Sequence, residues 1–192
     1  MPKFEPKFIL LYPPQHFDPR FGSVKPDGSL GLLYLSSALR NANFNVHVLD
    51  ATVGESLSAL DDIFYSHHKL PNGRYRVGMS CEQINEAVAD YDVVGVSSIF
   101  TAQTRAVEET ISAIRIAHPT KLIIMGGVNA RSQAARFLKI GADIICSSEA
   151  EQTIVEIGEV LRAGRSDFSQ ISGIIFQNGN KTVVTPSATA LF

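Results

Sequence analysis

The chain has 192 residues, of which 45% are hydrophobic and 19% charged, and its formal net charge at pH 7 is −2. This length suits one ordinary domain with its own core, and the apolar fraction excludes wholesale disorder. The mildly acidic balance argues against nucleic acid as a partner, because neutralising phosphates needs clustered Lys and Arg. No apolar run approaches the roughly 20 residues of a membrane span, so we expect no membrane partner either.

The first residues and the cysteines indicate the compartment. The opening stretch, MPKFEPKFILLYPP, carries charges and has no small-residue cleavage pattern, so it does not read as a secretory signal. Cys81 and Cys146 are too few for a disulfide scaffold or a cysteine-rich metal site. We therefore expect a cytoplasmic protein and assign no metal ligand in this chain.

Five short apolar runs, rich in β-branched residues, have the pattern of strands buried on both faces of a sheet. They are Phe8–Leu11, Val46–Leu49, Val93–Val96, Leu122–Met125 and Ile144–Cys146. Segments with helical periodicity alternate with them, at about Leu30–Ala42, Ser80–Tyr91, Thr101–Ala117, Arg131–Ile140 and Glu151–Ala163. This alternation predicts an α/β fold, Rossmann-like (flavodoxin-like), with a five-stranded parallel sheet and helices on both faces.

Two stretches break the alternation. The segment between the second and third strands has room for one extra helix, at about Glu55–His67. Near the end, strand-like runs flank Asn178-Gly179, a pair that tolerates the positive φ of a hairpin turn. We expect residues 1–170 to form the α/β domain, and residues 171–192 to form a C-terminal β-hairpin and the start of a linker.

Ligands of open parallel sheets bind beyond the carboxyl ends of the strands, where the strand order switches. The residues that follow the five predicted strands are therefore the candidate binding site. They are Tyr12 and Pro13; Asp50 and Thr52; Ser97, Ser98, Ile99, Phe100 and Thr101; Gly126, Gly127, Val128 and Asn129; and Ser148, Glu149 and Glu151. Taken singly, each has an ordinary structural explanation, such as a tight turn for the glycine pair or a helix cap for Thr101.

The spacing of these residues is more informative than any one of them. Asp50–Glu55 are followed by 41 residues and then by Ser97–Ile99, and another 26 residues lead to Gly126–Gly127. This order resembles the motif of the cobalamin-binding fold, which reads Asp-x-His-x-x-Gly, then Ser-x-Leu, then Gly-Gly. Two positions depart from the motif: Thr52 stands where the cobalt-ligating His would be, and Glu55 stands where the Gly would be.

Over nearly all of its length the chain resembles the amino-terminal cobalamin-binding domain of class B radical SAM enzymes, a branch in which this departure occurs. The phrases that carry the resemblance are Ile9–Pro14, Leu30–Leu35, Asp92–Ser97, Met125–Gly127 and the closing Gly173–Pro186. The family usually has Gly-Glu-Gly-Glu after the fifth strand. Here that stretch reads Ser148-Glu149-Ala150-Glu151, so both acids remain and both glycines are absent.

The resemblance implies that cobalamin binds with its own base displaced and no His beneath the metal. Thr52 cannot replace the imidazole, because a neutral hydroxyl is a poor donor to a transition metal. Gly126 and Gly127 would let the nucleotide tail run against backbone. The small hydroxyls of Ser97, Ser98 and Thr101 would donate to the cofactor's amides and phosphate, and the helix beginning near Asn129 would offer N–H groups.

The chain itself contains no recognisable catalytic residue. The radical SAM motif Cys-x-x-x-Cys-x-x-Cys, which holds a 4Fe-4S cluster, does not occur in it. S-adenosylmethionine and the cluster would therefore belong to a radical SAM domain of the same polypeptide that is missing from this sequence. The resemblance implies methyl transfer or oxidative cyclisation as the reaction of the whole enzyme.

One alternative stays open and two others fit the residues less well. The loss of the His and of the two glycines would also suit a cobalamin-fold domain that binds no corrinoid and serves as a structural or substrate-shaping interface. A flavin binder would need a Ser/Thr-rich phosphate loop after the first strand, where Tyr12–Gln15 offers none. A phosphoacceptor receiver domain would need a pair of acidic residues near that strand. No acidic residue occurs between Phe8 and Asp18.

Three basic side chains lie in predicted loops outside this set. Arg74 and Arg76 precede the helix at Ser80 and could reach a phosphate or an amide of a ligand, although a solvated basic loop is an equal alternative. His16 lies in the loop after the first strand, where a solvated position is the plainer expectation.

Overall fold

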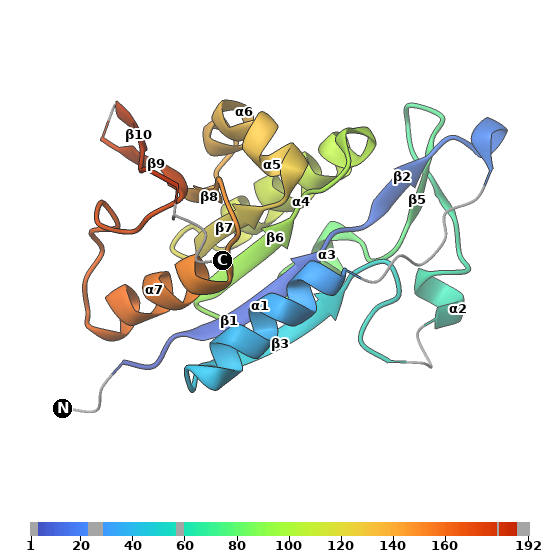
Figure 1. Ribbon diagram of the computed structural model, residues 1–192. Coiled ribbons are helices and arrows are strands. Elements are labelled where there is room, and N and C mark those ends of the chain that lie inside the picture. Colours follow the sequence, from blue (N-terminus) through green and yellow to red (C-terminus); the bar gives the residue numbers. More distant parts are fainter. Residues whose placement is uncertain (1–3, 23–28, 57–59, 180, 188–192) are drawn as a thin grey trace.

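The computed structural model describes residues 4–22, 29–56, 60–179 and 181–187, and within these ranges its main sheet has seven strands (Figure 1). The strand order is β10-β9-β8-β7-β6-β1-β3. The strands are β1 (Lys7–Tyr12), β3 (Asn45–Asp50), β6 (Val93–Ser97), β7 (Leu122–Gly126), β8 (Ile144–Cys146), β9 (Ile174–Asn178) and β10 (Lys181–Val184). The first five pair in parallel, which confirms the predicted parallel sheet.

The C-terminal hairpin is also confirmed, and it continues the main sheet. β9 pairs antiparallel with β8, and β10 pairs antiparallel with β9. The turn between β9 and β10 begins at Gly179, whose φ of +58° suits glycine. The predicted linker continues to residue 192, and its last five residues, 188–192, lie outside the described ranges.

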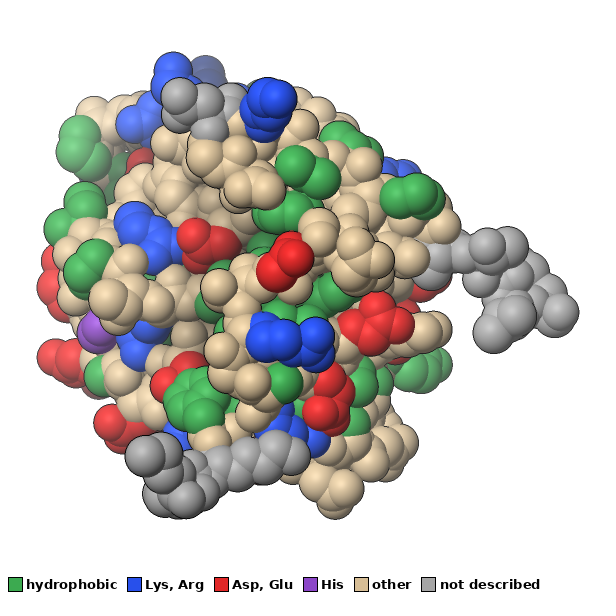
Figure 2. Space-filling model, turned by 90° about the vertical axis from the view of Figure 1, so that its left-hand side faces the viewer, with side chains coloured by type: hydrophobic (Ala, Val, Ile, Leu, Met, Phe, Trp, Pro, Cys, Tyr) green, Lys and Arg blue, Asp and Glu red, His purple; other side chains and the backbone are tan. Residues whose placement is uncertain are grey.

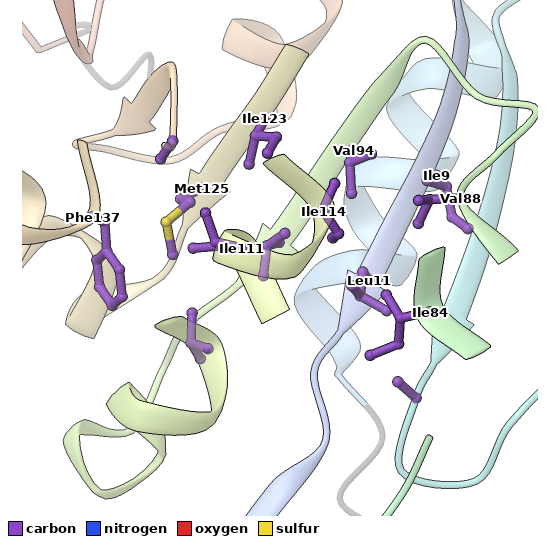
Figure 3. Close-up of a cluster of buried hydrophobic side chains, with 14 of the residues drawn as sticks. Ile9, Leu11, Ile84, Val88, Val94, Ile111, Ile114, Ile123, Met125 and Phe137 are labelled. Carbon is purple, nitrogen blue, oxygen red and sulfur yellow. The ribbon is translucent and has the colours of Figure 1, made fainter. Parts of the chain in front are cut away.

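Helices cover both faces of the main sheet (Figure 1). One face carries α1 (Leu30–Asn41) and α7 (Glu151–Arg162), and the other carries α3 (Cys81–Ala87), α4 (Thr104–Ala117), α5 (Val128–Ser132) and α6 (Ala134–Lys139). Alternate strand residues serve the two layers: Leu10 packs in the α1–α7 layer, whereas Leu11 packs in the opposite layer. Figure 3 shows this opposite layer, where Ile111 of α4 lies near Met125 and Ile114 lies near Val94. Burial on both faces explains why the strands are continuously apolar.

Local signals place several helix ends where the sequence predicts them. The backbone N–H of Gln83 donates to Ser80 Oγ at 3.3 Å, and that of Ser80 donates to Gln83 Oε1 at 2.8 Å, so α3 begins with a capping box. The helix predicted over Arg131–Ile140 is instead two short helices, α5 and α6, which meet at Gln133. Gly141, with a φ of +118°, follows the end of α6.

A second, antiparallel sheet was not predicted from the sequence. It has the order β2-β5-β4 and consists of β2 (Gln15–Phe17), β4 (His68–Lys69) and β5 (Tyr75–Val77). This small sheet continues beyond the carboxyl end of β1 (Figure 1), and a 3₁₀ turn, η1 (Pro19–Phe21), follows β2.

Two predictions in this region are wrong. Instead of a helix over Glu55–His67, the described part of that stretch has only α2 (Leu60–Ile63), and residues 57–59 lie outside the described ranges. His16 is not solvated: it is the central residue of β2 and is 4% exposed. The Ile63 carbonyl accepts a hydrogen bond from the Gly78 N–H at 3.0 Å, which a continuing helix would not allow. The burial of His16 was missed because its strand is short. Strands of two or three residues are too short to show a period and form only because a partner strand is present.

The surface shows no single dominant charge on the face seen from the side of β9, β10 and α7 (Figure 2). Acidic, basic and apolar side chains are interspersed there, so this face offers no continuous basic surface of the kind that nucleic acids require. None of the helices in the described part of the chain combines the length and the apolar character that crossing a membrane demands.

Candidate functional site

A cleft of about 330 Å³ opens at the carboxyl ends of β6, β7 and β8, on the face that α1 and α7 cover. We call it the α1–α7 cleft. Its apolar walls include Leu10, Leu32, Leu35, Val96, Ile124 and Ile154, and its polar lining includes Ser97, Arg131, Ser147, Ser148, Glu149 and Glu151. In the main sheet, β3 lies on one side of β1. The chain then returns to the other side of β1, where β6, β7 and β8 follow in order. The strand order therefore reverses between β1 and β6, which is where open α/β sheets bind ligands.

Eight of the sixteen residues predicted for the site line this cleft. They are Ser97, Ile99, Gly126, Gly127, Val128, Ser148, Glu149 and Glu151. The other eight, which are not among its lining residues, are Tyr12, Pro13, Asp50, Thr52, Ser98, Phe100, Thr101 and Asn129. Tyr12 and Pro13 are buried where the chain passes from β1 to β2, and Thr101 begins the 3₁₀ turn η3 (Thr101–Gln103) without acting as a side-chain cap.

The two glycines after β7 have different structural roles. Gly127 has a φ of +107°, and a Cβ on it would overlap the carbonyl oxygen of Ser98, so the fold itself requires glycine there. Gly126 does not have a positive φ, and no heavy atom of the described residues lies within 4 Å of the place where its Cβ would be. Because Gly126 lines the cleft, this free space is continuous with it. The protein's own packing therefore gives no reason for glycine at 126.

Gly31 adds a second open position on the α1 side of the cleft, and the prediction from sequence missed it. It is the second residue of α1 and lines the cleft, and the space around its missing Cβ is free of described atoms within 4 Å. Gly31 and Gly126 therefore leave two sides of the cleft free of side chains.

Ser98 and Asn129 hold the rim of the cleft in place. Asn129 is buried, and its side-chain N–H₂ donates to Ser98 Oγ at 2.8 Å and to Thr104 Oγ1 at 3.0 Å. The backbone N–H groups of Asn129 and Ala130 both donate to the Ser98 carbonyl at 3.1 Å. These bonds tie the loop after β6 to the start of α5, which fixes the turn that contains Gly127.

Thr52 and Asp50 form a closed turn after β3. Thr52 is fully buried, its hydroxyl donates to Asp50 Oδ1 at 2.6 Å, and its backbone N–H donates to the same oxygen at 2.9 Å. The side chain at the position of the motif's cobalt-ligating His is therefore short, buried and already hydrogen-bonded.

Two polar side chains of the cleft lining have few partners among the described residues. Ser148 Oγ is buried and has no hydrogen-bond partner among the described residues. Arg131 donates from Nη1 to the Ser147 carbonyl at 3.3 Å and is the cationic side chain in the described lining. Burial raises the pKa of the Cys146 thiol to about 12, so this part of the lining is a neutral, apolar surface at physiological pH.

An apolar rim borders the cleft. Ile99 is 40% exposed and Val128 is 63% exposed, and both line the opening, while the neighbouring Phe100 is 53% exposed. We call Ile99, Phe100 and Val128 the apolar rim. Large exposed side chains gathered beside a pocket are typical of a surface that a ligand or a partner covers.

Comparison with known proteins identifies the fold and the family. The model of the B12 binding domain family matches residues 23–158. A radical S-adenosylmethionine methyltransferase, TsrM from Kitasatospora setae, was solved with cobalamin and a [4Fe-4S] cluster bound. It matches with a TM-score of 0.69 and 18% identity, over 97% of this chain and 30% of that one.

A second similar structure is OxsB, a cobalamin-dependent S-adenosylmethionine radical enzyme solved with aqua-cobalamin bound. The TM-score is 0.68 and the identity 18%, over 97% of this chain and 23% of that one. The chain thus spans less than a third of either enzyme, and no curated protein sequence matches it. The predicted fold, the resemblance and the cofactor class, cobalamin, are confirmed. The chain belongs to the B12-binding domain family.

Proposed function

We propose that this chain is the cobalamin-holding part of a radical SAM enzyme, with the nucleotide tail of the cofactor in the α1–α7 cleft. The open Cβ position of Gly126 is the observation that carries the proposal, because it leaves a path along the backbone that any side chain would narrow. A tail in this cleft would meet Ser97 and the unpartnered Ser148 Oγ.

The size and surface of the site suit a corrinoid in two parts. A cleft of about 330 Å³ is within the range of small-molecule sites but is too small for a whole corrinoid. It has room for the slender tail, and the broad corrin disc would lie outside it, against the apolar rim. The rim's exposed side chains, Ile99, Phe100 and Val128, would lose contact with water when covered.

The proposed binding mode has no protein ligand from position 52 beneath the cobalt. A tail that lies in the α1–α7 cleft cannot also bring its base to the metal. Thr52 offers no substitute, since its hydroxyl donates to Asp50 and is a poor ligand for a transition metal. Bound cobalamin would supply a cobalt centre that changes oxidation state and carries an alkyl group.

The enzyme to which this domain would belong is proposed from its relatives. TsrM and OxsB are both described as S-adenosylmethionine radical enzymes, and TsrM holds its [4Fe-4S] cluster in a chain much longer than this one. We place S-adenosylmethionine and the cluster in a further domain of the same polypeptide, following the hairpin β9–β10. Methyl transfer or oxidative cyclisation would be the reaction, and the role of this chain would be to hold and orient cobalamin.

Adding cob(II)alamin to the chain and recording its EPR spectrum tests the proposal. The expected result is binding with a spectrum that lacks nitrogen superhyperfine splitting, because neither the cofactor's base nor an imidazole would ligate cobalt. Splitting in the bound form would contradict the base-displaced mode. No binding at millimolar protein and cofactor would instead favour a domain of this fold that holds no corrinoid and serves as an interface.

A further inference from the structure

A second polar cluster lies on the small sheet, and none of its residues lines the α1–α7 cleft. His16 of β2 pairs directly with Arg76 of β5, and Arg74 lies immediately before the first residue of β5. Arg74 donates from Nη2 to the His16 carbonyl at 3.5 Å. We call these three residues the His16 cluster.

The His16 cluster has an unusual concentration of unsatisfied polar atoms. His16 Nδ1, Arg74 Nε and Arg76 Nε are all buried, and none has a hydrogen-bond partner among the described residues. Buried polar groups in folded proteins are normally hydrogen-bonded. Half of the six unpartnered buried side-chain atoms in the described ranges lie in this one cluster, so a shared cause is indicated.

The nearby carboxylates already have partners. Glu109 is 3.0 Å from Arg105 Nε and 3.6 Å from His16 Nε2. Asp18 is paired with Arg20 at 2.6 Å.

Glu82 is the remaining carboxylate near Arg76, and a hydrogen bond with Ser80 lowers its pKa. Arg76 contributes to this lowering, and Arg74 likewise helps to lower the pKa of Asp18, so both arginines feel nearby carboxylates. Within the described residues, however, neither Arg74 nor Arg76 is among the side chains that form an ion pair within 4.0 Å. Burial also lowers the pKa of His16, which leaves its imidazole neutral near pH 7 and able to donate or accept a hydrogen bond.

The position of the cluster relates it to the edge of the sheet where the cofactor would bind. β2 follows β1 along the chain beyond its carboxyl end (Figure 1). The backbone N–H of His16 donates to Gln103 Oε1 at 3.0 Å, which ties β2 to η3. η3 directly follows Ile99 and Phe100, two of the three residues of the apolar rim. A ligand of the cluster would therefore lie at the same edge as the cofactor.

We propose that Arg74, Arg76 and His16 form a binding site for a small molecule that bears an oxyanion, either a phosphate or a carboxylate. The guanidinium fork matches the geometry of both groups and forms short charge-assisted hydrogen bonds with them. Arg74 and Arg76 are half-buried, so part of each side chain is exposed to solution. A cation site is the less suitable assignment, because the cluster is positive and no three His, Cys, Asp or Glu side chains gather for a metal among the described residues.

Thermal unfolding of the chain, without cobalamin, tests the site. Inorganic phosphate and acetate are titrated separately at constant ionic strength set by chloride, for the wild type and for Arg74→Gln/Arg76→Gln. We expect at least one of the two anions to raise the unfolding temperature of the wild type in a saturable way. Affinity for it should fall about tenfold or more in the double variant, as expected when a charge-assisted contact is lost. Stabilisation by phosphate alone indicates a phosphate-bearing ligand, and stabilisation by acetate indicates a carboxylate.

A matched control has the same change of charge elsewhere. Arg40→Gln/Arg165→Gln replaces two exposed arginines outside the His16 cluster and should respond to the anion as the wild type does. Equal stabilisation of all three proteins would overturn the site. NMR signals of the Arg Nε–H groups give a second readout in the wild type: those of Arg74 and Arg76 should move with the anion, and unmoved signals would also overturn it. Because cobalamin is absent, neither result depends on the proposed cofactor function.

Discussion

Replacing Gly126 with valine should weaken cobalamin binding about 100-fold while the free energy of unfolding changes by less than about 0.5 kcal/mol. The fold has free space at this position and does not need a positive φ there, so the apoprotein tolerates a side chain. The same side chain would project into the α1–α7 cleft, where the nucleotide tail needs the space. Absorbance titrations with hydroxocobalamin measure the affinity, and urea unfolding measures the stability.

The control for this variant is Thr182→Val, which places the same side chain on the exposed strand β10, outside the cleft lining. It should bind cobalamin as the wild type does. If Gly126→Val also bound with unchanged affinity, the cofactor would have to lie elsewhere on the protein.

The neighbouring substitution, Gly127→Ala, should instead act on stability and destabilise the apoprotein by about 3 kcal/mol. At a φ of +107° and a ψ of 164°, an alanine is in a conformation that is almost restricted to glycine, and its Cβ would overlap the Ser98 carbonyl oxygen. In a domain of this size such a loss lowers the melting temperature by roughly 6–12 °C. Calorimetry of the apoprotein checks this, and a loss below about 1 kcal/mol would show that the turn relaxes without strain.

The sequence predicts the parallel sheet well because its signals are local and strong. Runs such as Val93–Val96 are continuously apolar since helices cover both faces of the sheet, and a strand buried on both sides cannot alternate. The capping box at Ser80 and the stop at Gly141 likewise depend on a few neighbouring residues. The residues that predict each of these elements lie within a single turn or a single strand.

The small sheet could not be predicted for the converse reason. β4 has two residues and β5 has three, so neither shows a period, and each exists because β2 and the turn around Gly73 bring it a partner. The burial of His16 and the gathering of Arg74 and Arg76 beside it follow from that pairing. Two segments of unremarkable composition therefore bring together three of the six unpartnered buried side-chain atoms in the described residues.

The candidate site was predicted in part. The strand ends identify the edge of the sheet, and half of the predicted residues line the α1–α7 cleft there. The sequence could not separate Gly126 from Gly127, since only the path of the Ser98 loop shows which glycine the fold requires. Nor could it show that Ser98 and Asn129 bond to each other, or that Gly31, far away along the chain, faces the same opening.

The position of cobalamin on the protein is the central claim, and amide chemical shifts measured with and without hydroxocobalamin test it most directly. The largest shifts are expected at Gly31 of α1, Gly126 of β7 and Ser148 of the loop after β8, which line the same cleft. Shifts confined to the small sheet around His16, or an unchanged spectrum at millimolar cofactor, would contradict binding in the α1–α7 cleft.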